Sequence, residues 1–166
     1  MGEKSATIVK TGFGNVGILQ NGAKISRLWL PGLSRNELVQ RIRKYSPTVS
    51  FTKNSPLIEK LTRYFNGHEV TFNCPIDYEN FPDFSITVLK ELQKIGWGKI
   101  ETYKGLAERI GKPRAARAIG MVMAKNPVPL IIPCHRVIRS DGGLGGFTTP
   151  LGVELKRRML ALESKL

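Results

Sequence analysis

The sequence predicts an α+β protein with two domains. A small antiparallel sheet with helices is expected over residues 1–82, and a mostly helical domain containing a helix-turn-helix over residues 83–166. Three observations support this: β-rich runs fill the first thirty residues, helical periodicity dominates after Ser85, and no low-complexity linker or internal repeat intervenes. A chain of 166 residues can bury a hydrophobic core without disulfides.

Three β-rich runs open the chain, at residues 6–10, 15–20 and 23–30. Asn21 and Gly22 separate the last two runs, and this pair favours a two-residue hairpin because both turn positions need a positive φ. We therefore expect an antiparallel sheet.

Two helices and a short strand are expected to complete the first domain. Ser34 and Glu37 form a capping-box pattern ahead of a helix. A second helix is expected between the Ser-Pro pair at 55–56 and the Asn-Gly pair at 66–67. A strand is expected at residues 70–72.

The stretch GFGNVG, residues 12–17, matches the glycine pattern of dinucleotide-binding loops and has Glu37 twenty residues after Gly17. Such a loop must open a helix whose N-terminus meets the pyrophosphate. Only residues 18–20 separate it from the Asn-Gly turn, which leaves no room for a helix. We therefore expect no dinucleotide cofactor.

The second domain is expected to begin with a helix whose apolar stripe consists of Val88, Leu89, Leu92 and Ile95 and which Gly96 closes. Residues 86–166 carry 15 basic and 6 acidic residues, out of 26 and 13 in the whole chain. A field of this sign attracts polyanions such as nucleic acids or anionic membranes. The alternative is the basic surface of a thermophilic protein.

Two helices joined by a tight turn follow. Thr102 is a good N-cap for the first helix, and Gly111 is a suitable residue to end it. Pro113 is expected to start the second helix, which must stop at Asn126 because a residue before proline avoids the α region. This pattern indicates a helix-turn-helix.

The second helix of this pair has two unlike faces. One is apolar, with Ala116, Ile119 and Met123. The other combines cationic and small or flexible side chains and consists of Arg114, Arg117, Ala118, Met121 and Lys125. This composition suits close approach to phosphates. A solvated helix face is the alternative.

IIPCHRVI, residues 131–138, places Cys134 beside His135. Pro133 lacks an N–H and fits the first position of a helical turn, so we expect a short turn rather than a strand. The N–H dipoles of such a turn are expected to lower the pKa of the thiol and make Cys134 a nucleophile. The alternatives are an inert buried cysteine and, less favoured by ligand spacing, a zinc site with Cys74 and His68.

The cysteine pattern and the N-terminus indicate an intracellular, cytoplasmic protein. The two cysteines form no disulfide framework. The first residues lack the apolar core of a signal peptide, and no run approaches the roughly 18 apolar residues of a membrane span.

The run TYKGLAERIGKPRAARAIGMVMAKNPVPLIIPCHRVIRSDGGLGGF, residues 102–147, resembles the O(6)-alkylguanine-DNA alkyltransferases, also called methylated-DNA protein-cysteine methyltransferases. The resemblance covers about residues 81–163, and PCHRV after NPVP is its most specific part. It implies DNA repair by direct, stoichiometric and irreversible transfer of an alkyl group from O(6)-alkylguanine, and from O(4)-alkylthymine, to a cysteine. Duplex DNA is the implied partner, and we expect a monomer without a cofactor, a metal or a membrane.

The resemblance also implies the catalytic residues. Cys134 would accept the alkyl group, and His135 would take its proton through a bridging water. Glu163 would orient His135, as the third group of a triad holds the base. Asn126 would tie the helix-turn-helix to the turn that carries the cysteine.

The substrate base must leave the duplex before it can react. By the resemblance, Arg117 fills the vacated stack and Tyr103 crowds the phosphate and donates to guanine N3. Carbonyl groups of Cys134 and Val137 would accept from the guanine amino group, and Thr148 would donate to the alkylated oxygen. The base pocket is thus expected to contain Tyr103, Val137, Phe147 and Thr148, with Phe147 standing where many relatives have tyrosine.

Two other function classes compete. One is a helix-turn-helix regulator or damage sensor that binds DNA without chemistry, against which the Cys134-His135 pair argues. The other is a Cys-His hydrolase, which needs an oxyanion hole that the sequence does not reveal.

Overall fold

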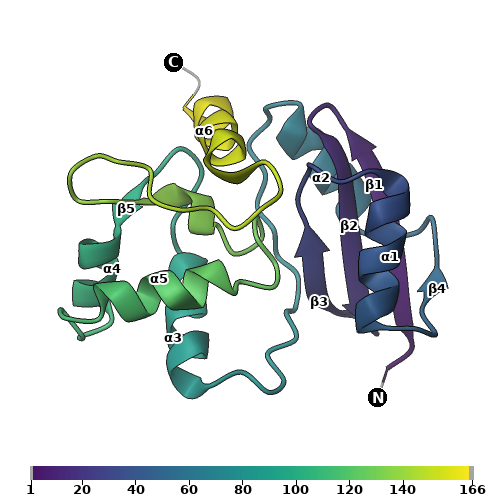
Figure 1. Ribbon diagram of the computed structural model, residues 1–166, viewed down its shortest axis with the longest axis horizontal. Helices are drawn as coiled ribbons and strands as arrows, with labels where there is room; N and C mark the ends of the chain where they lie inside the picture. Colours follow the sequence, from purple (N-terminus) through teal and green to yellow (C-terminus); the bar gives the residue numbers. More distant parts are fainter. Residues whose placement is uncertain (1, 165–166) are drawn as a thin grey trace. The chain divides into compact units, whose positions relative to one another are not determined.

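The computed structural model describes residues 2–164 and divides the chain into two compact units, Met1–Asp77 and Tyr78–Leu166 (Figure 1). The first unit combines a sheet with helices and the second is mostly helical, which confirms the α+β class. No helix in residues 2–164 is long and apolar enough to span a membrane.

The first unit contains a four-stranded sheet in the order β3-β2-β1-β4. Antiparallel pairing joins β1 to β2 and β2 to β3, whereas β4 is a two-residue strand parallel to β1. The hairpin between β2 and β3 is present, but its turn is one residue later than expected: Asn21 ends β2 and pairs with Lys24, so the turn residues are Gly22 and Ala23. Of Asn21 and Gly22 only Gly22 adopts a positive φ, of 58°, so the expectation of positive φ at both was wrong. The strands are β1 Lys4–Thr11, β2 Gly14–Asn21, β3 Lys24–Trp29 and β4 Ser50–Phe51.

Two helices, α1 Arg35–Tyr45 and α2 Leu57–Phe65, complete the first unit. The capping box is present: the Glu37 N–H donates to Ser34 Oγ, and the Ser34 N–H donates to the Glu37 carboxylate. A Cβ at Gly17 would lie 3.2 Å from a Leu38 methyl carbon. The absence of a side chain at Gly17 therefore lets α1 pack closely against the sheet. The GFGNVG stretch therefore serves the sheet and opens no helix.

One expected element is missing from the first unit. Residues 70–72 form no strand. Instead Ile76 makes a single parallel bridge with Ile25 of β3, closed by hydrogen bonds from the Ile25 N–H to the Pro75 carbonyl and from the Asp77 N–H to the Ile25 carbonyl. The segment that reaches the edge of β3 thus lies a few residues further along the chain than expected.

The second unit has four α-helices and one 3₁₀ turn within the described residues. Val88, Leu89, Leu92 and Ile95 are all buried, as the predicted stripe requires, although the first helix ends at Leu92. The elements are α3 Asp83–Leu92, β5 Glu101–Thr102, α4 Tyr103–Arg109, α5 Ala116–Ala124, η1 Cys134–Arg136, β6 Val137–Ile138 and α6 Gly152–Glu163.

The helix-turn-helix consists of α4 and α5. Thr102 Oγ1 accepts from the Gly105 N–H at 2.9 Å as the N-cap, and Gly111 has a φ of 71° after the helix. The second helix begins at Ala116 rather than at Pro113, so the expectation of its start was wrong. Arg114 therefore lies in the turn before α5 and does not share its face.

Candidate active site

Cys134 lies at the start of the 3₁₀ turn η1, directly after Pro133. The Cys134 N–H donates to the Ile132 carbonyl at 2.8 Å, and the Arg136 N–H donates to the Pro133 carbonyl at 3.0 Å. The expected turn is present. Since three residues make one turn of a 3₁₀ helix, neighbouring side chains project in different directions, and His135 does not point along the Cys134 side chain.

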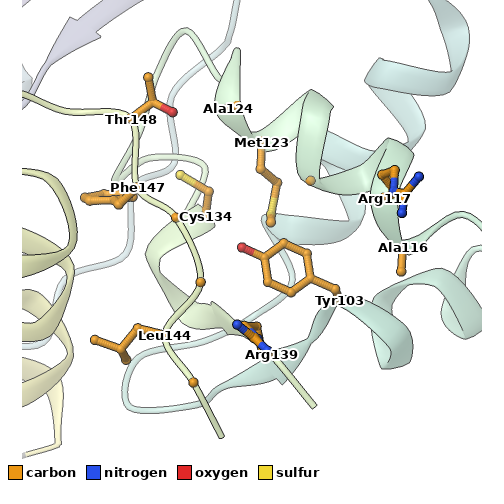
Figure 2. A pocket seen from close by; sticks show the side chains of 14 residues that line it. Tyr103, Ala116, Arg117, Met123, Ala124, Cys134, Arg139, Leu144, Phe147 and Thr148 are labelled. Atoms are coloured by element: carbon orange, nitrogen blue, oxygen red, sulfur yellow. The ribbon is translucent and has the colours of Figure 1, made fainter. Parts of the chain in front are cut away.

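Cys134 has 6% of its surface exposed and lines a cavity of about 930 Å³ in the second unit (Figure 2). Pockets of roughly 300–1,000 Å³ hold small organic ligands. Figure 2 places Cys134 beside Phe147, with Tyr103 and Met123 across the cavity. The complete lining is Tyr103, Ala116, Arg117, Gly120, Met123, Ala124, Cys134, Arg139, Gly143, Leu144, Gly145, Gly146, Phe147 and Thr148.

A buried hydrogen-bond network lies behind the cysteine. His135 Nε2 is 2.6 Å from Glu163 Oε1, and Arg136 donates to both Glu163 oxygens, Nε to Oε2 at 2.8 Å and NH2 to Oε1 at 3.0 Å. The third guanidinium nitrogen, NH1, donates to the Ile95 carbonyl at 2.5 Å. This network joins η1, the end of α6 and the segment after α3.

Electrostatics keep Glu163 ionised and His135 neutral. Burial raises the pKa of Glu163, but the hydrogen bonds from His135 and Arg136 and the charge of the Arg136 guanidinium outweigh it and hold that pKa below its ordinary value. Burial lowers the pKa of His135, and the Glu163 carboxylate offsets only part of this effect. A neutral imidazole beside an ionised carboxylate has its hydrogen on Nε2, so Nδ1 is the basic nitrogen.

The pKa of Cys134 corrects one expectation from the sequence. Burial raises the pKa of the thiol, and this outweighs the lowering by Asn126, by the Lys156 charge and by the N–H groups of the turn. The expected net decrease was wrong, because turn dipoles do not compensate for near-complete removal from water. Cys134 is therefore a thiol at neutral pH and needs a base.

Asn126 lies just beyond α5 and connects that helix to the segment before the cysteine. Its Nδ2 donates to the Ile132 carbonyl at 2.9 Å, and its Oδ1 accepts from the Val128 N–H at 3.1 Å. Its side chain also lowers the pKa of the Cys134 thiol. A single residue thus fixes the approach of the chain from the helix-turn-helix to η1.

Tyr103 begins α4 and forms one wall of the cavity. The parallel pairing of β5 with β6, with Thr102 opposite Ile138, brings the start of α4 next to the strand that follows η1. A Cβ at Gly145 would lie 2.8 Å from the Tyr103 hydroxyl oxygen, and Gly145 has a φ of 71°. Burial raises the pKa of Tyr103, so its hydroxyl stays protonated and can donate.

Comparison with known proteins places this geometry in a family. Residues 83–165 match the family model of the 6-O-methylguanine DNA methyltransferase DNA-binding domain. Curated proteins named methylated-DNA–protein-cysteine methyltransferase, from Saccharolobus islandicus and Saccharolobus solfataricus, are 46% identical over 114 residues, 69% of this chain and 70% of theirs. The chain belongs to this methyltransferase family.

Solved structures agree with that assignment. Mycobacterium tuberculosis OGT in complex with DNA is 29% identical, with a TM-score of 0.80 over 96% of this chain and 92% of that one. A second structure, of the M. tuberculosis O6-methylguanine methyltransferase, is 27% identical, with a TM-score of 0.79 over 97% of this chain and 93% of that one. The likeness covers both units of this methyltransferase-family chain.

The site residues expected from the sequence fall into three places. Tyr103, Arg117, Cys134, Phe147 and Thr148 line the cavity. His135, Glu163 and Asn126 belong to the network behind the cysteine, and Val137, completely buried, is not among the lining residues. Exposed on the surface are Arg114, Met121 and Lys125, while Ala118 is half-buried.

Sequence reasoning missed three residues of the site. Arg136 and Lys156 are buried cations, and Arg139 lines the cavity. Lys156 Nζ donates to the Val137 carbonyl at 2.6 Å, and burial lowers the pKa of Lys156 to about 8. Arg136 directly follows the Cys-His pair, which was a signal, but Lys156 begins a KRR run that is typical of a solvated helix face.

Proposed function

We propose that this protein repairs DNA by transferring the alkyl group of O(6)-alkylguanine, or of O(4)-alkylthymine, directly and irreversibly to Cys134. One observation carries the proposal. The cysteine that lines a cavity large enough to admit a purine base directly precedes the histidine that is hydrogen-bonded to Glu163. An inert buried cysteine needs neither. The names of the relatives and the DNA complex of the M. tuberculosis protein support this reaction and argue against a binder without chemistry.

The reaction is a displacement at carbon. The sulfur of Cys134 forms a bond to the alkyl carbon as the bond between that carbon and the guanine oxygen breaks. His135 takes the thiol proton at Nδ1 through a bridging water, since Glu163 holds the hydrogen on Nε2. The leaving purine gains a proton, for which the Tyr103 hydroxyl is the donor at the cavity wall.

The product is a thioether, and no group in the described site is suited to break it. Each molecule therefore acts once, as a stoichiometric reagent. This reaction needs no cofactor, and among residues 2–164 no cluster of three or more metal-ligating side chains occurs. We propose that the protein works as a monomer in the intracellular compartment that holds DNA.

The helix-turn-helix presents the DNA surface in this proposal. Arg117 lies at the cavity, and Arg114, Met121 and Lys125 are exposed nearby in the sequence. Arg117 would fill the stack that the flipped base leaves. Small residues, Ala118 among them, let α5 approach a minor groove that is about 6 Å wide, where the degenerate base code gives low sequence specificity.

Mass spectrometry tests the proposal. After incubation with duplex DNA containing O(6)-methylguanine, the peptide holding Cys134 should gain one methyl group, with a total yield equal to the protein present. Half-buried Cys74 is the internal control and should remain unmodified. Repeated turnover, or methylation at Cys74 instead of Cys134, would contradict the proposal.

A further inference from the structure

Arg136 donates three side-chain hydrogen bonds within the buried network. It has 7% of its surface exposed, and its guanidinium nitrogens donate to both oxygens of Glu163 and to the Ile95 carbonyl. A fork of this kind is the geometry in which arginine binds a carboxylate most specifically. Glu163 is itself 4% exposed, so solvent cannot replace these bonds.

The two partners of Glu163 meet at one atom. Oε1 accepts from His135 Nε2 at 2.6 Å and from Arg136 NH2 at 3.0 Å. A carboxylate with one hydrogen-bond partner can rotate broadly about its last torsion. With Arg136 on both oxygens, that rotation is fixed, and the oxygen that faces His135 has a single position.

We propose that Arg136 is a positioning residue for alkyl transfer: it fixes the rotation and the ionised state of Glu163, and through Glu163 the tautomer of His135. The inference rests on the proposed function, because it concerns the base of that reaction. Arg136 itself does not line the cavity and touches no reacting atom.

The charge balance supports this role. His135 is neutral, so the full positive charge in the bonds to Glu163 comes from Arg136. The other buried cation, Lys156, donates its hydrogen bond to the Val137 carbonyl and not to Glu163. The Tyr103 hydroxyl, another possible donor, lies at the cavity wall. Neither can replace the guanidinium.

Loss of Arg136 would reverse the tautomer of His135. A buried carboxylate without a cation becomes protonated, because burial disfavours the charged form. A protonated Glu163 donates a hydrogen bond instead of accepting one, so His135 Nε2 must accept it. The ring hydrogen then lies on Nδ1, and the nitrogen that takes the thiol proton is lost.

A double-mutant cycle tests the proposal on the full chain. Single-turnover rates with O(6)-methylguanine duplex are measured for wild type, Arg136→Met, Glu163→Gln and the double variant. We expect each single change to slow the reaction by about tenfold or more, and the double variant to be within about twofold of Glu163→Gln. Losses that multiply would overturn the proposal, because they would show that Arg136 does not act through Glu163.

Nuclear magnetic resonance of the His135 ring nitrogens shows which nitrogen carries the hydrogen. This position should not change if Arg136 only stabilises the fold. The wild type should show the hydrogen on Nε2, and Arg136→Met should show it on Nδ1. Arg136→Lys keeps the charge and should retain the Nε2 hydrogen while regaining part of the rate. If Arg136→Met does not fold, Arg136→Lys is the informative variant, and an Nδ1 hydrogen in it at wild-type rate would overturn the proposal.

A matched control separates this network from arginine loss in general. Arg157 forms an ion pair with Glu154 on the exposed face of α6, both 61% exposed, so Arg157→Met should leave rate and tautomer unchanged. Methyl transfer to Cys134 in wild type tests the proposed function separately. If wild type is not methylated, that function fails; if it is methylated but the Nε2 hydrogen persists in Arg136→Met, only the present inference fails.

Discussion

Lys156 Nζ lies 2.6 Å from the carbonyl oxygen of Val137, and the Lys156 residue has no exposed surface. The turn that carries the nucleophile is thus held by a buried cation on α6. The charge of Lys156 lowers the pKa of Cys134, and burial of the ammonium in turn lowers the pKa of Lys156 to about 8. The buried charge of Lys156 therefore favours the Cys134 thiolate but lowers the stability of the folded protein.

Lys156→Met should stabilise the protein and slow its chemistry. Removing a buried charge gains roughly 3 kcal/mol, and leaving the Val137 carbonyl without its donor loses about 1–3, so we expect the free energy of unfolding to rise by roughly 1 kcal/mol at pH 7. Reaction with the free O(6)-alkylguanine base should be slower, because loss of the ammonium charge removes one of the effects that lower the pKa of the Cys134 thiol. Lys104→Met, at an exposed ion pair, is the control. A less stable or equally reactive Lys156→Met protein would contradict this account.

The stability advantage of Lys156→Met should disappear at high pH. The pKa of Lys156 is about 8 in the folded chain and 10.5 in the unfolded chain, so between these values the unfolded state binds more protons. The stability of the wild type therefore rises through this window relative to the variant. Urea unfolding of both proteins at about pH 7, below this window, and at about pH 9 and 10, within it, measures the difference. If the difference in the free energy of unfolding between Lys156→Met and wild type grows with pH, Lys156 is not the buried cation.

Arg117→Ala should weaken repair of duplex DNA more than reaction with the free alkylated base. Arg117 lines the cavity and is proposed to fill the vacated stack, a step that the free base does not need. Single-turnover rates on both substrates give the comparison, and equal losses would remove the flipping role.

Arg114→Ala is the matched control for Arg117. Arg114 lies in the turn before α5 and is exposed, away from the cavity lining. Its loss should weaken binding to DNA and reduce the log-log slope of affinity against salt by about 0.9, the effect of one lost phosphate contact. The rate of bound duplex should stay the same. A large rate loss in Arg114→Ala would mean that flipping is not assigned to Arg117 alone.

Thr148 and Thr149 should respond differently to loss of their hydroxyl groups. Thr148 lines the cavity, whereas the buried Thr149 Oγ1 has no hydrogen-bond partner within residues 2–164. Thr148→Val should slow transfer from the free base, because it removes the proposed donor to the alkylated oxygen. Thr149→Val should leave the rate unchanged and raise the melting temperature. The reverse pattern would mean that Thr149, and not Thr148, donates to the alkylated oxygen.

Local signals in the sequence predicted the local structure well. The Ser34-Glu37 capping box and the turn after Pro133 each depend on residues within a few positions of one another. The hairpin after β2 was also expected, but its turn lies at Gly22-Ala23, one residue later than expected, because Asn21 still pairs with Lys24 in the sheet. The start of α5 was missed by three residues, because Pro113 is compatible with a helix start but the Arg114-Ala115 pair continues the turn. The strand at 70–72 was wrong because a strand exists only where a partner edge is available.

The sequence by itself determined the fold class, the helix-turn-helix and the placement of Cys134 next to His135 in a short turn, since these follow from periodicity, capping and a motif within short segments. Only the tertiary structure decided which charges are buried around them. Glu163 meets Arg136 from 27 positions further along the chain, and Lys156 lies in a basic run that sequence reasoning assigns to solvent. Burial and partner distances set pKa values, and both arise when α6 packs against the turn.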